Sequence, residues 1–140
     1  MNLEELLAEA DEILAAVEPL TVPVTLGKST VGVRFLPMDG ARWRGLTVKH
    51  PPRPDVPADM NRGYNIDAVV GAYPDVALII GDTVDDMLRV QEDGTRVSAW
   101  PETWKRLTAT GRDDVAAEMW SAHELIPEKL VDAEGKALAG

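Results

Sequence analysis

The chain has 140 residues, of which 45% are hydrophobic, and a net charge of −10 at neutral pH. This length fits a single domain with a core of its own, and the negative charge opposes binding to nucleic-acid phosphates. The absence of cysteine excludes disulfides, thiolate zinc sites and cysteine nucleophiles.

The N-terminal segment is predicted to form an acidic amphipathic helix over residues 2–17. Asn2 can cap this helix with Glu5 reaching back, and Pro19 ends it. Apolar residues recur at helical spacing on one face, namely Leu3, Leu6, Leu7, Ala10, Ile13, Leu14 and Val17. The segment has no basic region and no long apolar run, so we expect no signal peptide, no membrane span and a cytoplasmic location. The helix packs on its own domain or on a partner, and the sequence leaves both open.

The next segment, residues 22–36, contains Gly27-Lys28-Ser29, which is how a phosphate-binding P-loop ends. A P-loop needs a glycine five residues earlier, where this chain has Val22, and a helix directly afterwards. Instead, apolar residues alternate on both sides of the glycine, as they do in strands. We therefore predict a β-hairpin over 22–36, with Gly27 supplying a positive φ in the turn.

A short helix is predicted over 40–49. Its apolar residues are Trp43, Leu46 and Val48. The proline-rich stretch 50–54 ends it, because proline lacks an amide donor and restrains its predecessor, and an ordered loop follows to Gly63. Residues 27–62 carry seven bases against three acids. We expect this basic segment to pair with the acidic first helix, or alternatively with an acidic surface of another protein.

Between Tyr64 and residue 98 the chain is expected to hold a helix and a second hairpin. The apolar run after Pro74 predicts a helix over 74–80, preceded by a shorter helical or extended piece. A buried strand over 76–80 is the alternative, because a short apolar run fits both structures. The turn sequence Glu92-Asp93-Gly94 lies between apolar residues and predicts a hairpin over 86–98.

Two helices are predicted towards the C-terminus, over 101–109 and 113–125. Gly111 is expected to act as the C-cap of the first. The inner face of the second is predicted to be Val115, Ala116, Met119, Trp120 and His123. Periodicity is lost after Pro127, which is typical of a flexible tail.

Together these elements predict an α+β fold with an N-terminal helix, a β-hairpin, several short helices and a possible second hairpin. We expect three parts. Residues 1–20 form the acidic helix, 21–126 a compact α+β domain, and 127–140 a flexible C-terminal tail.

No catalytic, cofactor or metal site emerges from the spacing of chemically active residues. His50 and His123 have no ligand-type partners nearby in sequence, so we expect structural or surface roles. The stretch 82–86, with Asp82, Asp85 and Asp86, lacks the spacing and terminal glutamate of a calcium loop and is predicted to be an acidic turn. Ser29, Ser98 and Ser121 lack a nucleophile-elbow context. The tryptophans at 43, 100, 104 and 120 are expected to anchor the core. These patterns predict a binding protein and not an enzyme.

Four stretches occur in a characteristic order and spacing. They are Arg34-Phe35-Leu36-Pro37, Trp43-Arg44-Gly45-Leu46, His50-Pro51-Pro52-Arg53-Pro54 and Arg62-Gly63-Tyr64-Asn65-Ile66-Asp67. In this arrangement the chain resembles the tail assembly chaperones of long-tailed bacteriophages and prophages, especially those of actinobacterial hosts. The helix pair at 101–107 and 113–125 is similar to their W-x-x-L ending. The resemblance spans about residues 22–125 and is strongest over 30–67.

The resemblance implies a non-enzymatic role in the host cytoplasm, without a cofactor. Such chaperones coat the tape-measure protein, keep its hydrophobic helices soluble and help to recruit the major tail-tube protein before leaving the tail. An acidic domain with an apolar face suits this task, because charge opposes self-aggregation while the face covers a client helix. We expect self-association or client binding to involve Leu3, Leu6, Leu7, Ile13 and Leu14.

The family resemblance also implies a longer product made by a −1 ribosomal frameshift near the end of the reading frame. Glu134, Gly135 and Lys136 can be encoded by a sequence that contains the slippery heptamer G-GGA-AAG.

The main alternative function is a structural tail or head–tail completion protein that stays in the virion. An acidic DNA mimic is disfavoured by the basic residues of 27–62, and an enzyme would have to rely on the carboxylates of 82–86.

Overall fold

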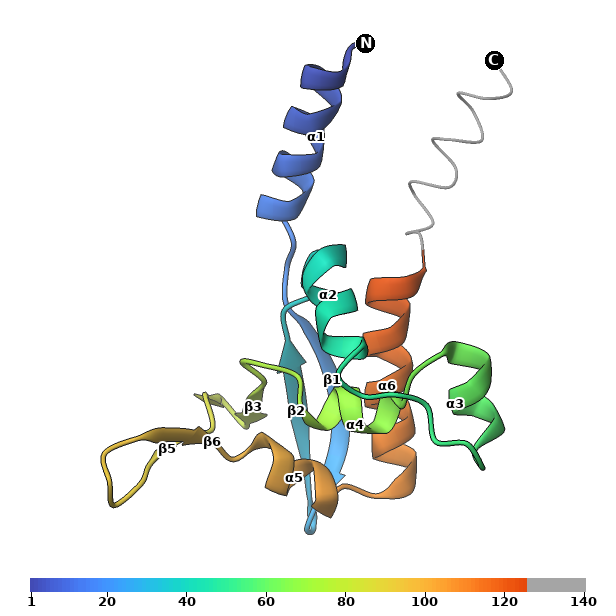
Figure 1. Ribbon diagram of the computed structural model, residues 1–140. Helices are drawn as coiled ribbons and strands as arrows, with labels where there is room; N and C mark the ends of the chain where they lie inside the picture. The colour runs from blue at the N-terminus through green and yellow to red at the C-terminus, as the bar shows by residue number, and fades with distance from the viewer. Residues whose placement is uncertain (126–140) are drawn as a thin grey trace.

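A computed structural model describes residues 1–125 of the chain, which adopt an α+β fold (Figure 1). The predicted tail at 127–140, and with it the proposed frameshift residues Glu134, Gly135 and Lys136, lies outside the described residues. None of the helices among the described residues has the length and apolar character needed to cross a membrane.

Six helices and six strands make up the described part of the chain. In order they are α1 (Leu3–Ala15), β1 (Leu20–Leu26), β2 (Ser29–Phe35), α2 (Gly40–Thr47), α3 (Pro57–Arg62), α4 (Ile66–Gly71), β3 (Ala77–Ile80), β4 (Thr83–Asp85), β5 (Leu88–Val90), β6 (Arg96–Ser98), α5 (Trp100–Arg106) and α6 (Ala109–Glu124). Strands β1 to β4 form one antiparallel sheet in sequence order, and β5 pairs with β6 in a separate hairpin. Both predicted hairpins are therefore confirmed.

The β1–β2 hairpin shows the structural role of Gly27-Lys28-Ser29. Leu26 pairs with Ser29 across the turn, and Gly27 has a φ of +63°, which glycine adopts without steric cost. A strand follows the turn where a P-loop would have a helix, so this stretch is a hairpin turn. Strand β1 lies at one edge of the sheet and contains Pro23, opposite Gly32 of β2.

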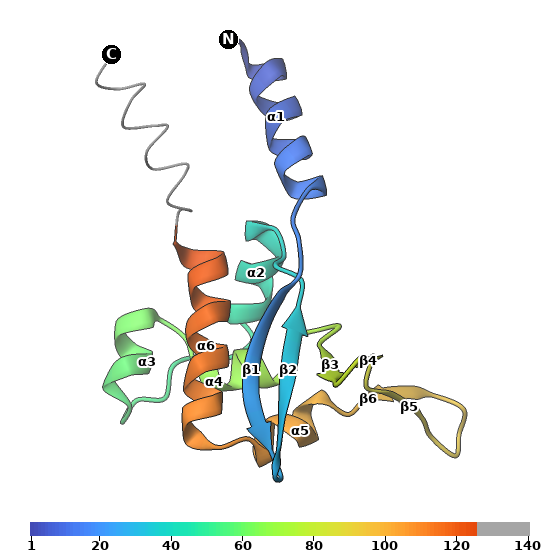
Figure 2. The same cartoon turned by 180° about the vertical axis from the view of Figure 1, so that it is seen from behind.

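The core lies between the sheet and the helices α4, α5 and α6. Alternate residues of β1 and β2 point into it, because successive side chains of a strand face opposite sides. Helix α6 packs on both β1 and α4 (Figures 1 and 2). Three of the four tryptophans are core residues as predicted, and the fourth, Trp120, is half-buried against the core. The indole of Trp100 donates a 2.7 Å hydrogen bond to the Val70 carbonyl, which satisfies its one polar atom inside the core.

Three predictions of local structure are wrong. The ordered loop expected up to Gly63 contains the short helix α3, which begins at Pro57, a residue favoured in the first turn of a helix. The preferred helix over 74–80 is absent, and the alternative strand forms as β3, which pairs with both β2 and β4. The run is rich in β-branched residues, and an open sheet edge on β2 was available to it. Gly111 is not a C-cap, because α6 begins at Ala109 and includes it. Its amide hydrogen-bonds to the Thr108 hydroxyl at the N-terminus of that helix.

Helix α1 stands apart from the rest of the described chain. In both views it projects beyond the end of the sheet, joined to β1 by residues 16–19 (Figures 1 and 2). No residue of α1 is buried. Its apolar side chains therefore play no part in the core.

Candidate functional site

The helix α1 forms where the sequence predicts it, and for the predicted reason. The Asn2 side chain accepts a 2.9 Å hydrogen bond from the Glu5 amide, which satisfies one of the unpaired donors at the helix start. Glu4 and Glu5 in the first turn also lie favourably near the positive end of the helix dipole. These local interactions explain a helix of 13 residues that touches little else.

The five residues predicted to bind a partner lie on one face of α1 and are all exposed. Their spacings of three, four and seven residues place them along a single side of the helix. They are Leu3, Leu6, Leu7, Ile13 and Leu14, with exposed fractions between 49% and 64%. We call these residues the α1 stripe. A run of large apolar side chains left in water is typical of an interaction surface.

The other sides of α1 are acidic, with five carboxylates in the helix and no base. Isolated helices of about this length are only marginally stable in water, and most helices gain their stability from packing. The expected pairing with the basic segment 27–62 does not occur among the described residues. There, two cations of that segment form ion pairs, Arg53 with Asp59 and Arg44 with Glu124, and none pairs with α1.

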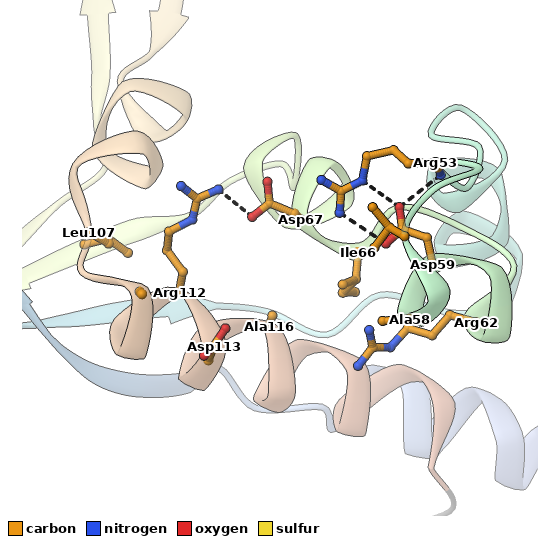
Figure 3. A pocket seen from close by; sticks show the side chains of 12 residues that line it. Arg53, Ala58, Asp59, Arg62, Ile66, Asp67, Leu107, Arg112, Asp113 and Ala116 are labelled. Carbon is orange, nitrogen blue, oxygen red and sulfur yellow. Dashed lines mark hydrogen bonds and ion pairs between the residues drawn. The ribbon is translucent and has the colours of Figure 1, made fainter.

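A second feature, absent from the sequence predictions, is a groove of about 510 Å³ between α3 and α6. Its apolar lining includes Ile66, Leu107 and Ala116. Three arginines reach it from separate segments, and three aspartates, Asp59, Asp67 and Asp113, line it beside them. Figure 3 shows Arg53 and Arg112 on either side of Asp67, with Arg62 nearer to α6. We call this feature the arginine groove.

Two of the three arginines are held in place by carboxylates. Arg53 donates to Asp59 at 2.7 Å and 3.2 Å, and Asp59 is 1% exposed. The hydrogen bond from Arg53 keeps the pKa of Asp59 below its usual value, against the opposing effect of burial. Arg112 pairs with Asp67 and also lies over the Trp104 ring, 4.8 Å from its centre.

Arg62 differs from the other two arginines. It is exposed, and it takes part in none of the ion pairs between described residues. Arg53 and Arg112 keep guanidinium hydrogens beyond those they donate to carboxylates. The groove is therefore lined by equal numbers of arginines and aspartates, and its free guanidinium hydrogens can donate to an incoming acceptor.

The histidines have structural surroundings. His123 lies half-buried against Trp43, and its Nε2 accepts a 3.1 Å hydrogen bond from the Met38 amide. Its Nδ1 lies 2.6 Å from the Met119 carbonyl and donates to it. The carbonyl of His50 accepts a 2.9 Å hydrogen bond from the Asn65 amide, which ties the loop after α2 to the start of α4.

The carboxylates of 82–86 are engaged in their own turn. Asp85 binds Arg89 at 2.9 Å and accepts from the Met87 amide, and Asp86 accepts from the Leu88 amide. Within residues 1–125 no group of three or more histidines and carboxylates is arranged to hold a metal ion. Ser98 accepts a 3.1 Å hydrogen bond from the Trp100 amide at the start of α5.

A carboxylate that the sequence did not single out, Glu124 of α6, joins that helix to α2 and to the loop between α3 and α4. It accepts hydrogen bonds of 2.7 Å from the Trp43 indole and 2.9 Å from the Tyr64 hydroxyl. Burial acts to raise the pKa of Glu124, but these two bonds and the charge of Arg44 outweigh it and hold the pKa below its usual value. No spacing rule could have found this contact, because its partners lie 60 and 81 residues away.

In comparisons with known proteins, the chain matches no protein-family model, no curated protein and no solved structure. The two candidate surfaces, the α1 stripe and the arginine groove, therefore rest on the geometry of this chain.

Proposed function

We propose that the protein is a tail assembly chaperone that binds a hydrophobic helix of the tape-measure protein, keeps it soluble and helps to recruit tail-tube subunits. The observation that carries this proposal is the exposed α1 stripe. A helix with a continuous apolar face that no other described residue covers is suited to laying that face against another amphipathic helix.

The charge of α1 defines the chemistry of the client. Five carboxylates flank the stripe, so the favoured client helix has an apolar face bordered by lysine or arginine. The net charge of −10 supports the same role, because complexes coated with acidic domains repel each other. Binding of this kind needs no catalytic group, and we propose a non-enzymatic role in the host cytoplasm.

Co-expression with the tape-measure protein tests the proposal. The wild-type chain is expected to form a soluble complex with a tape-measure protein that is insoluble alone. The double variant Leu7→Asp with Leu14→Asp should lose the complex, because it places two charges in the stripe. Circular dichroism should show that the rest of the protein still folds, since neither leucine is buried. The variant Leu7→Gln with Leu14→Gln, which retains good helix formers, should also lose the complex.

A matched control uses two exposed valines outside α1, one in β4 and one in β5. Val84 and Val90 are 54% and 71% exposed, so Val84→Asp with Val90→Asp adds the same charge without touching the stripe. This control should keep the complex. The proposal fails if the α1 variants bind as well as the wild type, or if the control loses binding equally.

Mass spectrometry of purified particles separates the chaperone from the alternative of a structural tail or head–tail completion protein. A chaperone is absent from finished particles. Recovery of the chain in particles at the stoichiometry of a tail component would favour the structural role.

A further inference from the structure

A second pocket, of about 370 Å³, lies between α4 and α5, and Arg112 reaches it from α6. It is distinct from the arginine groove, although Asp67 and Arg112 border both. Small residues line it from the α4 side and leave room beside α5, namely Ala68, Gly71 and Ala72. Pro101 and Trp104 line it from α5, so most of its lining is apolar. We call it the Trp104 pocket.

Trp104 has a hydrogen-bond donor without a partner. The side chain is 4% exposed, and its Nε1 is buried and makes no hydrogen bond within the described part of the chain. Trp100, one turn earlier on the same helix, donates instead to the Val70 carbonyl. Buried donors are almost always paired, because a missing hydrogen bond is costly inside a protein. The Trp104 indole therefore calls for an acceptor that the described residues do not supply.

The Nε1 edge of this indole lies at the part of the pocket that Gly71 lines. A Cβ at Gly71 would be 2.8 Å from Cδ1 and 3.3 Å from Nε1, so glycine leaves this edge without a side chain against it. Arg112 lies over the same ring, 4.8 Å from its centre, and pairs with Asp67. Both members of that pair are partly exposed, and ion pairs of this kind are weak. The guanidinium can therefore shift and open the way to Nε1.

Cations outnumber carboxylates in the lining of the Trp104 pocket. Arg112 donates one hydrogen bond to Asp67 and keeps its other guanidinium hydrogens. Lys105 is exposed and pairs with Glu102, which is not part of the lining. Asp67 is the single carboxylate among the residues that line the pocket. The charge of the lining thus favours an anion.

We propose that the Trp104 pocket binds a small molecule with an apolar body of one ring and a single carboxylate. The body lies against Trp104 beside Ala72 and Pro101, and the carboxylate accepts hydrogen bonds from the Trp104 indole and from Arg112. The volume of about 370 Å³ is near the lower end of the range for ligand pockets, which suits a ligand of one ring.

This inference goes beyond the proposed function and does not depend on it. No residue of α1 lines the Trp104 pocket, so a ligand there leaves the α1 stripe open to a client helix. Each of the two proposals can therefore fail alone.

A titration of the full chain with phenylacetate, followed by nuclear magnetic resonance, tests the inference. The indole N–H signal of Trp104 should shift and saturate, with a dissociation constant of about 1 mM or tighter. The indole signal of Trp100 should shift less, because its acceptor is the Val70 carbonyl. Phenylacetamide has the same ring without the charge and should bind at least about fivefold more weakly.

Two variants remove the proposed donors one at a time. Trp104→Phe keeps a ring but has no N–H, and Arg112→Gln removes the guanidinium charge. Each should weaken phenylacetate binding at least about fivefold. The matched control is Arg106→Gln, the same change at an exposed residue of α5 outside the pocket lining, and it should bind like the wild type. The spectrum of each variant shows whether it is folded, and Arg112→Gln decides the matter if Trp104→Phe is not.

Absence of saturable shifts up to about 10 mM phenylacetate would overturn the inference. So would unchanged affinity in either folded variant, since the ligand would then lie elsewhere. Leu7→Asp with Leu14→Asp should bind phenylacetate like the wild type, because its Trp104 pocket is intact. Loss of the client complex in that variant, with phenylacetate binding retained, would support both proposals separately.

Discussion

The imidazole of His123 lies face to face with the indole of Trp43, with ring centres 4.0 Å apart and planes within 10° of parallel. This stack joins the last described helix to α2, which is 80 residues earlier in the chain. The hydrogen bonds around the ring fix its protonation. Nε2 accepts from the Met38 amide, so the ring is neutral with its proton on Nδ1.

The first prediction is that stability falls as this ring is protonated. Burial lowers the pKa of His123 below its usual 6.5, against the opposing effect of the Met119 carbonyl. The unfolded chain then binds the proton more tightly, so the stability is fully present above about pH 6.5 and is lost as the pH falls through the folded pKa. Urea unfolding between about pH 8 and pH 5 should show this loss.

The control for this prediction is His123→Gln, which cannot titrate in that range. It should be less stable than the wild type at about pH 8 and lose less stability on acidification. The paired carboxylates have lowered pKa values and stay ionised in this window, so they do not mask the effect. Equal pH dependence of the two proteins would contradict the assignment.

The second prediction concerns Gly71 at the end of α4. A Cβ at this position would lie 2.8 Å from Cδ1 of Trp104, whose ring is buried. Gly71→Ala should therefore destabilise the protein by about 1–3 kcal/mol, because the indole must shift. Gly45→Ala in α2 is the comparison, since its Cβ would meet nothing within 4 Å. That change should be neutral or stabilise by up to about 1 kcal/mol.

The third prediction concerns the Arg53–Asp59 pair beside the arginine groove. Arg53→Gln leaves the buried Asp59 carboxylate without its guanidinium and should lower the urea midpoint. Asp59→Asn in the same chain removes the uncompensated charge and should recover part of the loss. A double-mutant cycle measures the coupling, and additive effects of the two changes would show that the pair is energetically independent.

The fourth prediction is that the body of the protein folds without α1. Deletion of residues 1–15 should change the free energy of unfolding by no more than about 0.5 kcal/mol, since no α1 residue is buried. The helical signal in circular dichroism should fall while the near-ultraviolet signal of the buried tryptophans persists. Loss of that tryptophan signal would mean that α1 belongs to the core.

Features set by neighbouring residues could be predicted from the sequence. The α1 helix follows from the Asn2 cap and its periodic leucines, and the first hairpin follows from alternation on both sides of Gly27. The run 76–80 could not be assigned, because its strand is selected by pairing with β2 and β4. Local sequence patterns do not indicate which distant strands pair with each other.

The arginine groove could not be predicted either. The excess of bases in 27–62 was visible, but Arg112 joins Arg53 only when α6 folds back along α4. The exposure of the α1 stripe could not be predicted from the sequence either. An amphipathic pattern is the same whether the apolar face is buried against another surface or exposed to solvent.

Pro23 has a consequence for how copies of this chain meet. It sits in β1, whose outer edge has no strand beside it among the described residues, and proline offers no N–H there. An added strand would lose a hydrogen bond at that point, so β1 is a poor template for stacking of sheets into fibrils. The edge strand thus carries its own protection against cross-β polymerisation, a property that would suit a chain proposed to keep another protein from aggregating.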